Sequence, residues 1–140
     1  MELRAEIEAE AQRIPGLTVL TAAQARSVAM RFVGAFVAAS DNAWWWEALR
    51  DDAPTESVPY GDSDAWSLVR KWLPEQRSYV LLVTDEKPTP AGAVKGSLAD
   101  LATLVAECPY FEYVVTDEAA TFGILDTHHN VLIRVGRLPH

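Results

Sequence analysis

Residues 110–136 read, in order, YFEYVVT, DEAA, TFGILD, THHN and VLIRVG. Three runs rich in β-branched, aromatic and aliphatic residues are separated by two polar turns, at 117–120 and 127–130. This pattern is typical of consecutive antiparallel strands joined by short connections. We therefore predict that the chain ends in a three-strand β-meander, around which the other elements are arranged.

Helical patterns dominate the first half of the chain. Apolar residues recur at helical spacing over residues 2–14 and again over 22–39. Thr21 and Gln24 have the spacing of a capping box at the start of the second helix. Shorter helices are predicted at residues 43–50, 62–73 and 98–108.

One strand is predicted outside the meander, at residues 78–84, where the run is apolar on both faces. Two segments that contain proline and glycine, 51–61 and 85–96, are predicted to be loops. Together the patterns predict a single α+β domain over residues 1–140. In this fold the N-terminal helices pack mostly on one face of a four-stranded, mostly antiparallel sheet that ends in the meander.

Composition excludes several classes of function. The 140 residues carry a net charge of −8 with a pI of about 4.8, which disfavours binding to a nucleic-acid backbone. The single cysteine, Cys108, cannot form an internal disulfide, as suits a reducing compartment. The N-terminus lacks a signal-peptide pattern, and residues 22–39 are too polar to span a bilayer. We expect a cytoplasmic protein that binds neither membrane nor cofactor.

All five tryptophans lie between residues 44 and 72, in a region that also carries many carboxylates. Aromatic residues surrounded by charge suit a protein interface, and the acidic rim favours a basic protein partner. The predicted partner-binding residues are Trp44, Trp45, Trp46, Glu47, Asp51, Asp52 and Tyr60. Two alternatives stay open: the indoles pack inside between short helices, or they form the interface of a homo-oligomer.

The turn after Asp126 contains the adjacent pair His128 and His129. Imidazole beside a carboxylate suits general acid/base chemistry, so a small hydrolase or acid/base enzyme using these three residues is the alternative function. The same residue types also suit a solvated hairpin turn that has no function. Adjacent side chains of an extended segment point to opposite faces, so the two imidazoles would not readily chelate one ion, and no metal site is predicted.

The run FEYVV (111–115) together with DTHHNVLIRVG (126–136) resembles a family of small bacterial domains of unknown function. That resemblance implies no activity and no catalytic residues. In type, the chain is similar to immunity proteins, which neutralise secreted bacterial toxins. The sequence thus predicts a non-enzymatic binding protein that captures a basic partner through an acidic, Trp-rich surface.

Overall fold

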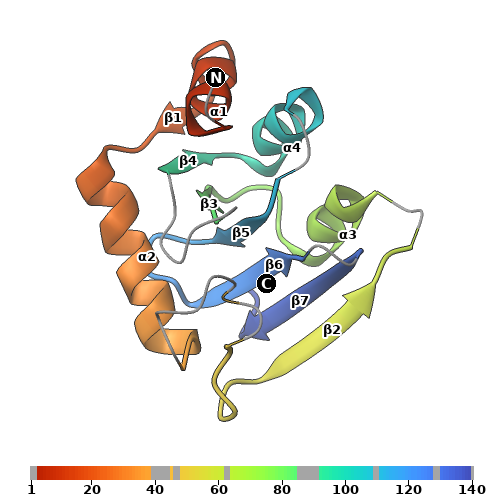
Figure 1. Cartoon of the computed structure of the whole chain (residues 1–140). Helices are drawn as coiled ribbons and strands as arrows, with labels where there is room; N and C mark the ends of the chain where they lie inside the picture. Colours follow the sequence, from red (N-terminus) through yellow and green to blue (C-terminus); the bar gives the residue numbers. More distant parts are fainter. Residues whose placement is uncertain are drawn as a thin grey trace.

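The computed structural model describes residues 3–38, 45, 48–61, 64–84, 92–108, 111–127 and 130–139. Within these residues, seven strands form one antiparallel sheet in the order β1-β4-β3-β5-β6-β7-β2 (Figure 1). The strands are β1 (Thr18–Val19), β2 (Thr55–Pro59), β3 (Tyr79–Val83), β4 (Gly92–Gly96), β5 (Tyr113–Thr116), β6 (Phe122–Asp126) and β7 (Val131–Gly136). The described helices are α1 (Leu3–Gln12), α2 (Ala22–Phe36), α3 (Ala65–Trp72) and α4 (Leu98–Glu107).

Helices cover both faces of the sheet. Figure 1 shows α1, α3 and α4 on one side and α2 on the other, and each side has its own cluster of buried hydrophobic residues. Strand β3 supplies both clusters: Leu81 belongs to the first, whereas Val80 and Leu82 belong to the second. Alternate strand residues point to opposite faces, so this inner strand is apolar throughout, as its sequence predicted.

The α+β class is confirmed, and β5, β6 and β7 lie side by side as the predicted meander. The predicted four-stranded sheet is wrong, because seven strands are present in the described residues. The meander also does not end the sheet, since β2 pairs with β7 along five residues. No helix in the described segments has the length and apolarity needed to cross a membrane.

Strand β2 lies in a segment predicted to be a loop. It is an edge strand that is mostly exposed, so no alternating hydrophobic pattern marks it. Tyr60 N donates to Asn130 O at 2.9 Å, so the preceding pair, Pro59 and Val131, is not a hydrogen-bonded pair. The N–H that proline lacks would therefore point away from β7, and proline is tolerated there.

Strand β4 also lies in a segment predicted to be a loop, and it is flanked by glycines. Gly96 is required by packing, because a Cβ atom there would lie 2.3 Å from Leu17 Cδ2. The glycine that made the segment resemble a loop instead lets the connection between α1 and β1 approach the sheet.

Candidate functional site

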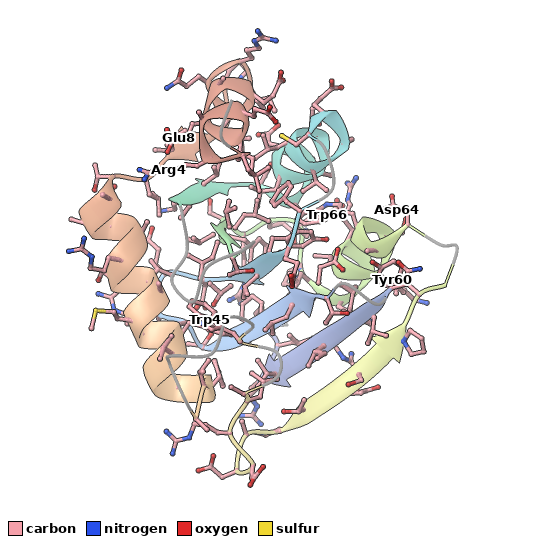
Figure 2. All side chains as sticks on the ribbon, viewed as in Figure 1. Arg4, Glu8, Trp45, Tyr60, Asp64 and Trp66 are labelled. Atoms are coloured by element: carbon pink, nitrogen blue, oxygen red, sulfur yellow. The ribbon has the colours of Figure 1, made fainter. Side chains whose placement is uncertain are left out.

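A cleft of about 420 Å³ opens where the ends of β2 and β6 meet α3 and the C-terminal end of α4. The described residues that line it are Tyr60, Gly61, Asp64, Ala65, Trp66, Val105, Cys108, Phe111, Tyr113, Asp126 and Asn130. Its volume is within the range of small-ligand pockets. Figure 2 shows Tyr60, Asp64 and Trp66 gathered at this side of the molecule.

Sheet pairing brings Tyr60 to Asp126 across 66 positions of sequence. Leu132 of β7 pairs with Val58 on one side and with Asp126 on the other, so the end of β2 lies near the end of β6. The Tyr60 hydroxyl donates a hydrogen bond to Asp126 Oδ1 at 3.0 Å. Asp126 is only 4% exposed, and the phenol therefore helps to solvate a buried carboxylate.

The phenol remains a donor at neutral pH. Burial raises the pKa of Tyr60 well above its ordinary value of 10.0, and the charge and the hydrogen bond of Asp126 raise that pKa further. Asp126 also lines a much smaller hollow of about 10 Å³ together with Glu112, which is 1% exposed. Two carboxyl groups are thus buried at the same end of the β5–β6 pair.

Aromatic rings form much of the cleft wall. The ring centroid of Tyr113 lies 5.7 Å from that of Trp66 and 5.7 Å from that of Phe111, in tilted or edge-on arrangements. Trp66 Nε1 donates to Leu98 O at 3.3 Å, which ties α3 to the start of α4. These contacts hold the wall in place from three different elements.

Asp64 caps α3 at the edge of the cleft. Its Oδ1 accepts a hydrogen bond from Trp66 N at 3.0 Å, as an N-cap residue does. A carboxylate at this position also offsets the partial positive charge of the helix N-terminus. The described lining therefore contains two carboxylates, Asp64 and Asp126, and neither Lys nor Arg.

Cys108 follows α4 and lines the cleft with a half-buried thiol. Burial raises the pKa of this thiol, and the negative charges of Glu10, Glu6 and Glu107 raise it further. The thiolate is the nucleophilic form, so Cys108 has little nucleophilic character at neutral pH.

The predicted partner-binding residues do not form one described surface. Trp45 is 3% exposed and stacks on Phe32 of α2, with 5.4 Å between ring centroids. The prediction that this ring faces a partner is wrong for Trp45. The ring instead packs against the wide apolar face of α2, on the side of the sheet opposite the cleft (Figure 2). Trp44, Trp46 and Glu47 lie outside the described residues.

Asp51 and Asp52 are exposed before β2, whereas Tyr60 follows it. Five strand residues at roughly 3.4 Å each separate the two groups by about 17 Å. Asp52 pairs with Arg50 at 3.2 Å, and the hydrogen bond and charge of that guanidinium lower the pKa of the carboxyl. Among the members of the predicted set that the structure describes, only Tyr60 lines the cleft.

The structure describes only part of the alternative catalytic set, Asp126, His128 and His129. Asp126 and the exposed Asn130 line the cleft, but His128 and His129 lie outside the described residues. Thr127 N and Thr127 Oγ1 both donate to Val131 O, at 3.2 and 3.0 Å, and this closes the hairpin. The proposed use of the imidazoles stays a prediction.

Sequence reasoning missed several cleft residues. Trp66 lies within the helix predicted at residues 62–73, and Phe111 and Tyr113 lie in the first run of the predicted meander, but no pattern placed them beside Tyr60. In the described segments, no group of three or more His, Cys, Asp or Glu side chains could hold a metal ion. Searches against protein-family models, curated proteins and solved structures find no match to this chain.

Proposed function

We propose that this is a non-enzymatic binding protein that captures a basic protein partner, in the manner of an immunity protein, and that the cleft anchors the partner. The observation that carries the proposal is the buried carboxylate of Asp126, which accepts a hydrogen bond from Tyr60 and lines a cleft rich in aromatic residues. No Lys or Arg is among the described residues that line this cleft.

The physical argument is one of charge compensation. A basic side chain that enters a cleft loses its hydration, and a carboxylate already buried there can offset that loss. The net charge of −8 would steer a cationic protein toward this surface. Asp51 and Asp52 are exposed and fit a peripheral steering role, separate from the anchor.

Affinity capture from the native host tests the proposal. The bait proteins are the wild type, Asp126→Asn, and a control, Glu118→Gln. Glu118 is an exposed carboxylate in the turn between β5 and β6, at the opposite end of these strands from the cleft, and it pairs with Lys95. Both variants remove one negative charge, but only the first removes it from the cleft.

We expect the wild type and Glu118→Gln to retain the same basic protein at equal stoichiometry. Asp126→Asn should weaken retention by roughly tenfold or more, as loss of one member of a buried charge pair does. Replacing Asp51 and Asp52 by Ala should weaken capture more at low salt than at high salt. A partner that is acidic, or one that Asp126→Asn retains fully, would contradict the proposal.

A small hydrolase or acid/base enzyme is the second candidate. Asp126 and Asn130 both line the cleft, and His128 and His129 lie between them in the sequence. Replacing both His128 and His129 by Asn discriminates the two functions. A binding protein keeps its partner after this change. If the protein is an enzyme, the wild type converts the substrate, whereas the variant leaves it unconverted.

A further inference from the structure

We propose that an extended basic segment of the partner adds to the outer edge of β2 as a further antiparallel strand. The inference rests on the proposed function, because the partner contributes the segment. It names what this edge recognises: a β-strand that carries lysine or arginine side chains on the same face of the sheet as α3.

The edge formed by β2 is long enough to act as a template. In the described sheet β2 is the last strand, beside β7, and four of its five residues are exposed (Figure 1). The opposite edge is formed by β1, which has only two residues. Because an exposed edge presents backbone groups to which another strand can pair, β2 is the better template of the two.

The pairing with β7 decides which backbone groups of β2 face outward. Tyr60 N donates to Asn130 O, and hydrogen-bonded pairs recur at every second residue of an antiparallel ladder. The even-numbered residues of β2 therefore bond to β7. The N–H groups of Thr55 and Ser57, and the C=O groups of Thr55, Ser57 and Pro59, point away from β7. An added antiparallel strand can pair with all five of these groups.

The charge along this edge favours a basic segment. Residues 51–64 contain five carboxylates and neither Lys nor Arg. Arg50 and Arg134 pair with two of these carboxylates, those of Asp52 and Glu56, so an excess of negative charge is left. The Glu56 side chain stays 61% exposed beside its partner. A cation on the added strand can therefore form a cross-strand pair with it.

Strand alternation decides where that cation lies. Glu56 is opposite Arg134, whose guanidinium carbon is 4.5 Å from the ring centroid of Trp72 on α3. A residue opposite Glu56 on the added strand therefore has its side chain on the α3 face, and its two neighbours have theirs on the other face. Beyond Pro59 the added strand reaches Tyr60, which lines the cleft, so one segment can occupy both the edge and the cleft.

A second copy of this chain fits the edge less well than a foreign segment. Two β2 strands paired about Ser57 set Pro59 opposite Thr55, and pairing about Val58 sets Pro59 opposite Ser57, so one carbonyl in each chain lacks a donor. Pairing about Glu56 sets two like charges directly opposite each other, which is destabilising. Each copy also carries a net charge of −8. A basic segment without proline avoids all three penalties.

Titration of the ¹⁵N-labelled full-length protein with synthetic peptides, followed by NMR, tests this inference. The basic probe is Lys-Thr-Lys-Thr-Lys-Thr-Lys with an acetylated N-terminus and an amidated C-terminus, and the acidic probe has Glu in place of each Lys. Two further basic probes carry one N-methyl group, on the central Thr or on the Lys beside it. With Lys side chains on the face of Glu56, the Thr N–H groups point toward β2 and the Lys N–H groups point away.

Hydrogen exchange should follow the same alternation. At a concentration of about five times its dissociation constant, the basic probe should slow exchange of the Thr55 and Ser57 amides by about sixfold. Exchange at Glu56 and Val58 should not change, because these amides already bond to β7. The probe methylated on Thr and the acidic probe should bind roughly tenfold more weakly, whereas the probe methylated on Lys should bind like its parent.

A pair of variants tests the edge from the side of the protein. Ser57→Pro removes one outward N–H group, and Ser57→Ala is the matched control because it keeps that group. Proline is already accommodated at the next outward position, Pro59. We expect Ser57→Pro to weaken binding of the basic probe by roughly tenfold, and Ser57→Ala to leave it unchanged.

Equal binding of the acidic probe, or of the probe methylated on Thr, would overturn the inference. So would exchange at Thr55 and Ser57 that slows with protein concentration when no peptide is present, because a second copy would then occupy the edge. The probe comparison uses the wild type, so it stands even if Ser57→Pro does not fold. If Ser57→Pro captures the basic partner fully while Asp126→Asn loses it, only the strand addition falls. If capture is independent of both residues, the proposed function falls as well.

Discussion

Replacing Tyr60 by Phe removes one hydroxyl group and leaves the ring, so it isolates the hydrogen bond to Asp126. Hydrogen bonds to charged groups contribute about 1.5–3 kcal/mol to stability. This bond measures 3.0 Å, longer than the strongest phenol–carboxylate bonds, and Tyr60 is partly exposed. We therefore expect a coupling energy between Tyr60 and Asp126 near the lower end, about 1–1.5 kcal/mol.

A double-mutant cycle measures this coupling. Urea denaturation at pH 7 gives the free energy of unfolding for wild type, Tyr60→Phe, Asp126→Ala and the double variant, and Ala removes the acceptor that an Asn amide oxygen would keep. Tyr79→Phe is the matched control, because the Tyr79 hydroxyl donates to a neutral acceptor, Pro74 O, at 2.7 Å. The cost of Tyr79→Phe, about 1 kcal/mol, should add to that of Asp126→Ala.

The outcome is decisive for the structure of the cleft. A coupling energy for the Tyr60–Asp126 pair well above that of the Tyr79–Asp126 control would establish the carboxylate–phenol contact. A coupling energy below about 0.3 kcal/mol, indistinguishable from additivity, would refute the reasoning. In that case the phenol would not hold the acceptor that the proposed cation needs.

Four further predictions concern two glycine positions and two titrations. Gly123→Ala should lower the free energy of unfolding by about 1–3 kcal/mol, because the new Cβ would lie 2.4 Å from Phe32 Cε2. Gly34→Ala, on the exposed face of α2 with nothing within 4 Å of its Cβ, should raise it by about 0.5–1 kcal/mol in the same urea assay. The folded state raises the pKa of both Tyr60 and Cys108 and so favours their protonated forms. The free energy of unfolding should therefore be level near neutral pH and fall as pH rises past their ordinary pKa values, in denaturation series up to pH 10.5; a rise with pH would refute this sign. The ordinary pKa of a cysteine thiol is 9.0, so alkylation of Cys108 by iodoacetamide should reach half its maximal rate above pH 9. A midpoint below that pH would contradict the raised pKa.

Local pattern in the sequence was enough for the elements that carry their own signal. The meander was predictable from two polar turns between β-rich runs, and the start of α2 from Thr21 and Gln24, which form the expected capping box. Strand β2 carries no such signal. It is held by backbone pairing with β7, which lies about 75 residues later in the chain, and long-range pairing leaves little trace in composition.

The candidate site shows the same limit. Asp126 and Tyr60 were each selected from the sequence, but for different hypotheses, one catalytic and one for partner binding. Only the position of β7 between β2 and β6 brings them into hydrogen-bond contact. Trp45 shows the converse error, since a cluster of aromatic residues in the sequence does not distinguish a surface from the covering of α2.

The central claim is that a cationic group occupies this cleft, and Cys108, the only cysteine of the chain, reports on it directly because it lines the wall. The measurement is the rate at which a maleimide labels Cys108 with saturating N-acetyl-L-arginine amide, compared with the same concentration of the citrulline amide. The account predicts that the cationic probe slows labelling severalfold while the neutral one leaves the rate unchanged. Equal labelling rates with both probes would contradict it.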